Sequence, residues 1–246
     1  MLFSLFLHKN KLQMELGSRN YTKEQTQTIQ AAFMSKVYTW MSGGLAITGL
    51  IAMYVASTPS LIQAIIGNRL LFFGLIIGEI FLVGYLVSVI KKISAQTAGF
   101  IFTGYAALNG LTLAVVFLIY TEQSIASTFF VTAGTFAIMS FYGYYTKKDL
   151  TSWGNLLFMA LIGIIIASVV NFFMQSEMMY WLITYAGVLI FVGLTAYDTQ
   201  KIKRMGAASE VGSEEESKSA IVGALMLYLD FINLFLLLLR ILGDRK

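Results

Sequence analysis

The chain of 246 residues is 57% hydrophobic and only 12% charged, against roughly 25% charged residues in a typical soluble domain. A water-soluble fold of this composition would lack a polar surface, so we expect one membrane-embedded bundle. The net charge of +4 does not indicate nucleic-acid binding, because the basic residues lie in short clusters between apolar runs. The chain has no cysteine and a single histidine, His8, which excludes disulfides, thiol chemistry and a histidine-built metal site or triad in the core.

Seven apolar runs are each long enough to cross a bilayer as one helix. A bilayer core of about 30 Å requires roughly 20 apolar residues per helix. To within several residues, the predicted spans are Lys36–Ser57, Arg69–Ile90, Ala98–Tyr120, Ser124–Tyr145, Gly154–Met174, Met179–Thr199 and Ser219–Leu242. The sequence therefore predicts an all-α membrane protein, with a polar N-terminal arm at residues 1–35 and a seven-helix transmembrane domain at residues 36–246.

Basic residues between the spans indicate which helix ends face the cytoplasm. They fall in alternate connectors, on the same side as the N-terminal arm: Lys91–Lys92, Lys147–Lys148, and Lys201, Lys203 and Arg204. Cytoplasmic connectors are enriched in Lys and Arg, so we expect a cytoplasmic N-terminus and, after seven spans, a C-terminus outside. The basic tail from Arg240 would favour the inside, which leaves a re-entrant last segment as an alternative. Short connectors favour a bacterial plasma membrane.

Three carboxylates interrupt the predicted spans. Glu79 lies near the middle of the second span, Asp230 near the middle of the last, and Asp198 near the end of the sixth. A carboxylate at the centre of a transmembrane helix costs at least about 2.5–3.5 kcal/mol on insertion scales, so such residues are often functional. Asn233 shares a helix face with Asp230. At each position, a group on an ion or proton pathway and a purely structural hydrogen bond are the two alternatives.

The predicted span ends do not bring the two aspartates together. They put Asp198 near the membrane surface and Asp230 about 10 residues into its helix, roughly 15 Å deeper at 1.5 Å per residue. The segment at residues 205–218 is polar, and we expect it to be a mobile connector.

The motifs of common enzyme classes are absent from the sequence. It contains no His-Glu-x-x-His zinc motif, no phosphate-binding loop and no serine nucleophile with a histidine to activate it. We therefore do not expect an enzyme, and we expect no cofactor.

Three segments carry a family resemblance. VGLTAYDTQKIKRM (192–205) and ALMLYLDFINLFLLLLRIL (224–242) resemble the Bax inhibitor family, and YTKKDLTSWG (145–154) is similar to the segment between that family's fourth and fifth spans. The resemblance covers about residues 20–246. It implies a seven-helix bundle with the last helix central and a pH-sensitive calcium leak through the membrane.

The resemblance also assigns roles to individual residues. It implies that Asp198 and Asp230 form the pH sensor and gate, and Glu79 matches the acidic residue of the family's second span. Lys91 and Lys92 are the nearest candidates for a basic latch. Two adjacent carboxylates resist carrying two charges, so a shared proton could close the path and its loss could open it.

Calcium prefers oxygen ligands. Asp198 and Asp230 could therefore bind it, with Glu79 and Asn233 along the ion pathway. The expected partners are the lipid bilayer, calcium and protons, and no nucleic acid.

A cation exchanger of the same gating would fit equally. The main alternative function is a non-transporting membrane regulator that acts by binding a partner, such as a membrane protease, in a stress or cell-death-suppressing role. A proton-coupled transporter is a third, weaker reading, because the sequence shows no internal repeat.

Overall fold

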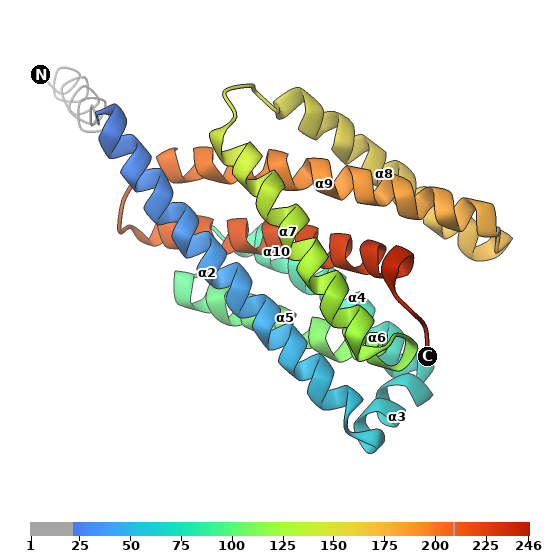
Figure 1. The fold of residues 1–246 in the computed structure, drawn as a ribbon. Helices are drawn as coiled ribbons and strands as arrows, with labels where there is room; N and C mark the ends of the chain where they lie inside the picture. The colour runs from blue at the N-terminus through green and yellow to red at the C-terminus, as the bar shows by residue number, and fades with distance from the viewer. Residues whose placement is uncertain (1–21, 209) are drawn as a thin grey trace, which may run out of the picture.

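The computed structural model describes residues 22–208 and 210–246, which are almost entirely helical (Figure 1). Its helices are α2 (Lys23–Ala56), α3 (Pro59–Gly67), α4 (Arg69–Val89), α5 (Ala95–Leu113), α6 (Val116–Ile119), α7 (Glu122–Tyr145), α8 (Thr151–Met174), α9 (Glu177–Ala208) and α10 (Glu214–Leu242). Within these residues, seven segments are long and apolar enough to span a membrane, with α5 and α6 together forming the third. The predicted all-α membrane fold with seven spans is confirmed.

Most of the predicted N-terminal arm, including His8, lies outside the described residues. The part that is described, from Lys23 onward, is helical and continuous with the first span. Thr22 caps this helix: its side chain accepts a hydrogen bond from the backbone N–H of Gln25, whose side chain accepts one from the backbone N–H of Thr22.

Five chain segments meet at one end of the bundle, here called the α9–α10 end. Lys36 Nζ donates to Glu216 Oε2 at 2.9 Å, which joins the early part of α2 to the start of α10. The first backbone N–H of α5 donates to Glu214 Oε1 at 3.1 Å. Arg204 Nη2 donates to Asp149 Oδ1 at 2.9 Å, joining α9 to the α7–α8 loop. The basic connectors predicted to share one side of the membrane therefore lie together at one end of the bundle.

The C-terminal tail lies at the opposite end. Asp244 N donates to Ser124 Oγ at 3.0 Å, and Lys246 N donates to the carbonyl of Ile119 at 2.9 Å. Lys246 Nζ donates to the carbonyl of Phe117 at 2.9 Å, so a positive charge of the tail lies against a backbone carbonyl of α6. Because α10 is a single helix of 29 residues that reaches this end, the re-entrant alternative is wrong.

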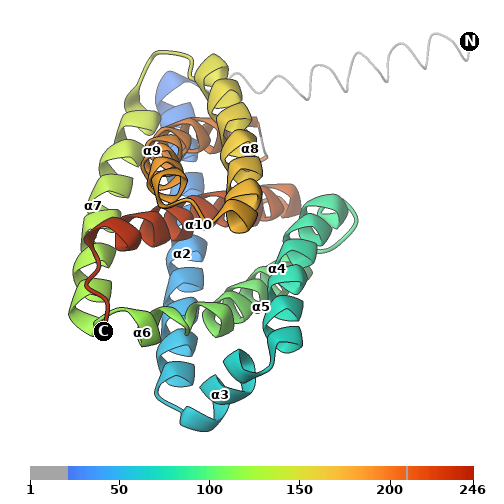
Figure 2. The ribbon, with the colours of Figure 1, turned by 90° about the vertical axis from the view of Figure 1, so that its right-hand side faces the viewer.

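The last helix is central, as expected. α10 contacts α9, α2, α7 and α5, and it lies between the α8–α9 pair and the α4–α5 pair (Figure 2). Among the described helices it contributes the most side chains to the hydrophobic core; Tyr228 is fully buried and makes edge-to-face ring contacts with Phe102 and Tyr105. α10 therefore has two faces, one toward α8 and α9 and the other toward α2, α4 and α5.

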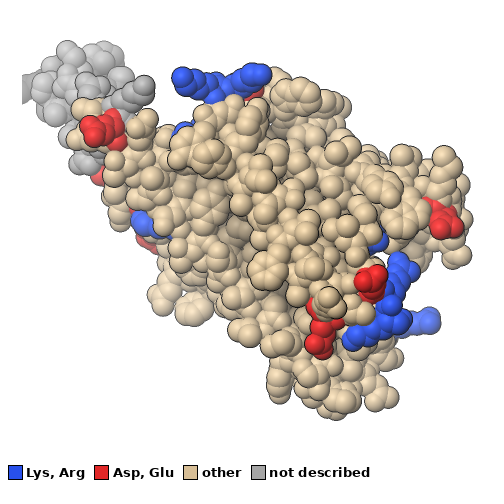
Figure 3. All heavy atoms as spheres, viewed as in Figure 1, with Lys and Arg blue, Asp and Glu red and all other residues tan. Residues whose placement is uncertain are grey.

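The surface between the two ends is uncharged. On the face in Figure 3, charged side chains gather toward the two ends, and uncharged atoms cover the broad area between them. Large apolar side chains such as Phe130 and Ile138 on α7 are exposed. This distribution matches a belt in contact with lipid.

The polar segment at residues 205–218 is largely helical, so the expected long connector is wrong. α9 continues to Ala208 and α10 begins at Glu214, which leaves only residues 209–213 between them. Three acidic residues in the first turn of α10 suit the positive end of the helix dipole. Glu216 is buried, and the hydrogen bonds that its carboxylate accepts from Lys36 and from the backbone N–H of Gly212 offset the cost of that burial.

Candidate functional site

A polar clamp fixes the α9 segment that carries Asp198. Gln200 Oε1 accepts from the backbone N–H of Leu150 at 2.9 Å, and Gln200 Nε2 donates to the carbonyl of Lys148 at 2.8 Å. Arg204 Nη2 donates both to Gln200 Oε1 and to Asp149 Oδ1, each at 2.9 Å. The two sequence segments around Asp149 and Gln200 that carry the family resemblance thus form one structural unit.

The clamp stays charged over a wide pH range. Hydrogen bonds from the side chain and backbone of Thr151, together with Arg204, lower the pKa of Asp149 to about 2. The sequence analysis missed this clamp. The available signal was the spacing of Gln200 and Arg204, which are one helical turn apart at a span end.

Two glycines bring neighbouring helices close to α9 beside Asp198. A Cβ atom at Gly143 of α7 would lie 2.9 Å from the Cα of Ala196, and a Cβ atom at Gly154 of α8 would overlap the ring of Tyr197. Small residues permit such close helix approach in membranes. α9 is therefore held on both sides just before Asp198.

Asp198 and Asp230 form a pair between α9 and α10. Their carboxyl groups lie within hydrogen-bonding reach of one another, so one proton can be shared between them. Asp230 is only 5% exposed, and its Oδ2 atom has no hydrogen-bond partner among the described residues. A buried polar atom without a partner is costly, and a proton shared with Asp198 would remove that cost.

Helix length and side-chain direction explain why the pair meets despite the predicted difference in depth. α9 continues 10 residues beyond Asp198, about 15 Å, and α10 begins 16 residues before Asp230, about 24 Å. Side chains lean toward the N-terminus of their helix. In this antiparallel pair Asp198 therefore leans away from the α9–α10 end and Asp230 leans toward it, which closes the remaining offset.

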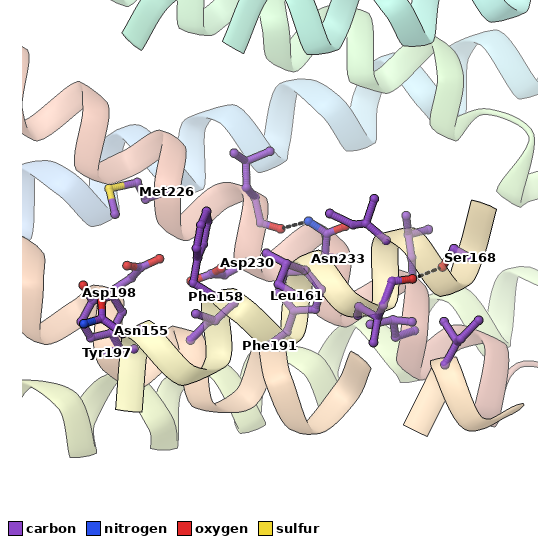
Figure 4. Close-up of a pocket in the computed structure, with 18 of the residues that line it drawn as sticks. Asn155, Phe158, Leu161, Ser168, Phe191, Tyr197, Asp198, Met226, Asp230 and Asn233 are labelled. Carbon is purple, nitrogen blue, oxygen red and sulfur yellow. Dashed lines mark hydrogen bonds between the residues drawn. The ribbon is translucent and has the colours of Figure 1, made fainter. Parts of the chain in front are cut away.

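The pair lines a cavity of about 710 Å³ between α8, α9 and α10. Figure 4 shows the two aspartates toward one side of the view, with Asn155 and Tyr197 beside Asp198 and with Asn233 beyond Asp230. Asn233 Nδ2 donates to the carbonyl of Leu229 at 2.8 Å. The remaining walls are mainly apolar. Of the predicted site residues, the structure thus brings together Asp198, Asp230 and Asn233.

Glu79 belongs to a different polar cluster. Its Oε1 accepts from Thr112 Oγ1 at 2.7 Å and its Oε2 accepts from Asn109 Nδ2 at 3.2 Å. Asn109 Oδ1 accepts from the hydroxyl of Tyr228 at 3.2 Å, and that hydroxyl also contacts Thr48 Oγ1 at 2.6 Å. Tyr228 precedes the aspartate of α10 by two residues, about 200° around the helix. The structure therefore does not bring Glu79 to the aspartate pair.

Lys91 and Lys92 also lie apart from the pair. They are exposed in the turn after α4, a helix whose main contacts are with α5 and α3. The basic residue that acts electrostatically on Asp198 is Lys201, which lines the same cavity and lies 5.7 Å from the ring centre of Tyr197. The sequence analysis proposed Lys91 and Lys92 as a latch, and the structure gives Lys201 the nearer position.

The pair offers few ligands for a metal ion. Across the described part of the chain, no three His, Cys, Asp or Glu side chains cluster as a metal site would require. Two carboxylates supply at most four oxygens, fewer than the six to eight that calcium takes in proteins. Calcium at the pair would therefore keep several water ligands.

The fold and this site define a polytopic α-helical membrane protein whose central helix carries a buried aspartate against a second aspartate. The chain belongs to the Bax inhibitor family, since the family model described as "Inhibitor of apoptosis-promoting Bax1" matches residues 30–246. It is similar to "Inner membrane protein YbhL" of Escherichia coli strain K12, with 52% identity over 217 residues that cover 87% of this chain and 92% of that protein.

Two more distant bacterial relatives extend the likeness. An uncharacterized protein of Borreliella burgdorferi is 47% identical over 225 residues, covering 91% of this chain and 97% of that protein. An uncharacterized membrane protein of Streptococcus pyogenes is 36% identical over 213 residues, covering 86% and 92%. The resemblance found in the three sequence segments is thus confirmed over nearly the whole transmembrane domain.

Proposed function

We propose that this protein is a proton-sensitive leak for cations, with calcium as the transported ion, gated by Asp198 and Asp230. The observation that carries this proposal is the contact between the buried carboxyl group of Asp230 and the partly buried one of Asp198 at the wall of a membrane-embedded cavity. Two acidic side chains inside a membrane protein cost free energy, and the net charge of the pair changes when a proton leaves.

The gate works through the number of protons on the pair. With one shared proton, a hydrogen bond joins Asp198 to Asp230 and holds α9 against α10. When that proton leaves, two negative charges face each other in a poorly solvated site, and their repulsion favours separation of the helices or entry of a cation. The clamp at Gln200 and Arg204 keeps the end of α9 fixed, so the movement is confined to the segment around the pair.

Calcium is the substrate of this path and not a resident cofactor. The carboxylates of Asp198 and Asp230 would replace part of its water shell, with the side chain of Asn233 next along the cavity. Glu79 lies on the other face of α10, so it would act on the path only through Tyr228 and α10 and not as a ligand beside the pair. An exchanger would use the same groups, with protons as the counter-ion.

The protein would sit in a bacterial inner membrane with its basic end in the cytoplasm. One relative is named an inner membrane protein. The Lys- and Arg-rich connectors share the α9–α10 end with the start of α2, and cytoplasmic ends are enriched in such residues. This orientation places the N-terminus inside and the C-terminal tail outside.

Calcium flux into proteoliposomes between about pH 5 and 8 tests the proposal. Wild type should show a flux that rises as the pair loses its shared proton. Asp198→Asn and Asp230→Asn, compared at equal amounts of folded protein, should lose this pH dependence because an amide cannot release the proton. Glu79→Gln is the matched control, since it neutralises a carboxylate in a transmembrane helix that does not contact the pair.

The outcomes separate the two function classes. A wild-type flux whose pH dependence survives in Glu79→Gln but not in the two aspartate variants supports the proton-gated leak. A complete absence of wild-type flux at every pH refutes it, and the non-transporting regulator then becomes the better proposal.

A further inference from the structure

The cavity beside the aspartate pair has the two acidic side chains at one side. The rest of it is a long apolar groove between α8, α9 and α10, here called the trough. Asp230 Oδ2 has no partner among the described residues, and the charged group that acts on Asp230 is the negative Asp198. The two basic residues of the lining are not partners of Asp230: Lys201 acts on Asp198 and lies over the ring of Tyr197, and Arg240 lies over the ring of Tyr180 at 5.4 Å. Without a proton shared with Asp198, the buried oxygen therefore has neither a hydrogen-bond donor nor a positive charge beside it.

The trough has the length and chemistry of a hydrocarbon chain. From Asp230 to Arg240, both in its lining, α10 rises about 15 Å at 1.5 Å per residue. Phe158, Leu161 and Ile165 of α8 form the facing wall. The volume of about 710 Å³ is within the roughly 300–1,000 Å³ of small-molecule sites in proteins.

The trough is accessible from the surrounding lipid through the side of the bundle that α8 forms. The main contact of α8 is with α9, so α8 covers the trough as an outer wall, and no further helix of residues 22–208 and 210–246 lies on it. Phe158 and Ile165 line the cavity and are nevertheless 58% and 55% exposed. A molecule dissolved in the bilayer can therefore enter past α8 without passing through water.

We propose that this cavity binds a single-chain amphiphile with a protonated primary amine, the amine against Asp198 and Asp230 and the hydrocarbon chain along α8 and α10. The ammonium group supplies the positive charge and the N–H donor that Asp230 lacks. The acids lie on the side of the cavity nearer the α9–α10 end, so the hydrocarbon chain runs from the pair toward the end of α10 that carries Arg240. The site uses the carboxyl pair of the proposed function but does not require ion flux.

The amine cannot bind at the pair while Asp198 and Asp230 share a proton. An ammonium group between the two carboxylates takes the position of the shared proton, and it also takes the place of an entering cation. The amphiphile would thus act as an inhibitor of the proposed leak that arrives through the membrane.

Binding of radiolabelled dodecylamine to the full chain in lipid nanodiscs tests this inference, with empty nanodiscs to measure partition into lipid. We expect saturable binding above the empty nanodiscs. Unlabelled dodecylamine should compete, whereas dodecanol lacks the charge, dodecyltrimethylammonium lacks the N–H donor and hexylamine lacks the chain length, so each should compete at least about tenfold more weakly. Dodecanoate tests the opposite orientation, with a carboxylate at Arg240.

Two substitutions locate the site. Asp230→Asn should weaken dodecylamine binding roughly tenfold or more, because it removes a charge-assisted hydrogen bond. Ile165→Trp fills the trough away from the acids and should also weaken binding; its control is Ile80→Trp, a lipid-facing position on α4 that does not line the cavity. The Ile165→Trp test remains decisive if Asp230→Asn does not fold.

The result can overturn the inference independently of the leak. Binding no greater than to empty nanodiscs, equal competition by dodecanol or dodecanoate, or binding unchanged in both Asp230→Asn and Ile165→Trp would each refute it. Because these are binding measurements, a negative result here leaves the calcium flux of the wild type unaffected, and a protein without flux can still bind the amine.

Discussion

Gly143→Ala should destabilise the protein through the contact between α7 and α9. The added Cβ would lie 2.9 Å from both the Cα and the carbonyl carbon of Ala196, and closer still to its carbonyl oxygen. All three are backbone atoms of a helix, so they cannot rotate away as a side chain could. Either α7 or α9 must move.

The size of the effect follows from this geometry. Carbon atoms pack best at about 3.5 Å or more, so the two helices must separate by about 0.6 Å to clear the two carbons and by more to clear the nearer carbonyl oxygen of Ala196. Overpacking of this kind typically costs about 1–3 kcal/mol. Because the clash is with backbone atoms, we expect a cost in the upper part of this range, about 2–3 kcal/mol. The intrinsic preference of helices for Ala over Gly returns up to about 1 kcal/mol, so we expect a net loss of roughly 1–2 kcal/mol in the free energy of unfolding.

Reversible unfolding in mixed dodecyl maltoside and SDS micelles, followed by tryptophan fluorescence, measures this loss. Gly134→Ala is the matched control, because Gly134 lies on the same helix and a Cβ there would have no atom within 4 Å. It should be neutral or slightly stabilising. If Gly143→Ala unfolds at the same SDS fraction as Gly134→Ala, the close approach of α7 to α9 does not exist in the membrane and the reasoning fails.

Three further predictions concern polar contacts. Tyr228→Phe removes the hydroxyl that contacts Thr48 at 2.6 Å, and it should lower the free energy of unfolding by about 0.6–1.5 kcal/mol in the same titration; an unchanged or higher value would contradict the contact. Lys36→Met leaves the carboxylate of Glu216, whose side chain is 3% exposed, without its ion-pair partner. Because the side chain of Lys36 is 46% exposed, the cost should stay below the roughly 3–5 kcal/mol of a fully buried pair, and adding Glu216→Gln should recover most of it. Folding lowers the pKa of Asp149 from 3.8 to about 2, so its stabilising effect is complete above about pH 4 and is lost as the pH falls toward 2. Hydrogen exchange of the α7–α8 loop, corrected for intrinsic rates, should accelerate over that interval in wild type, and Asp149→Asn should abolish the change.

The sequence by itself determined the class of the protein and the positions of its unusual residues. Seven spans and a carboxylate in the middle of the last are local properties, because they depend only on the length and polarity of each run. The three segments around Asp149, Asp198 and Asp230 were specific enough to indicate the family. The alternation of basic and non-basic connectors along the chain also predicted that the basic connectors lie on one side of the membrane.

The sequence could not give the length of α9 and α10 at the α9–α10 end. The segment at residues 205–218 is polar, and a polar run between two membrane spans is usually interpreted as a connector. Acidic first-turn residues and the ion pair between Lys36 and Glu216 instead make it helical, and that pair joins residues 180 positions apart. The extra turns, with the opposed lean of the side chains, bring Asp198 to Asp230.

Only the tertiary structure decided which faces of the helices point inward. α8 and α10 are both strongly apolar, yet α8 is largely exposed while α10 is largely buried. In water a hydrophobic stripe marks the buried face, but lipid tails are as apolar as leucine, so the pattern of apolar residues carries no such mark in a membrane. For this reason the sequence grouped Glu79 with the two aspartates, whereas the packing puts it with Tyr228 on the opposite face of α10.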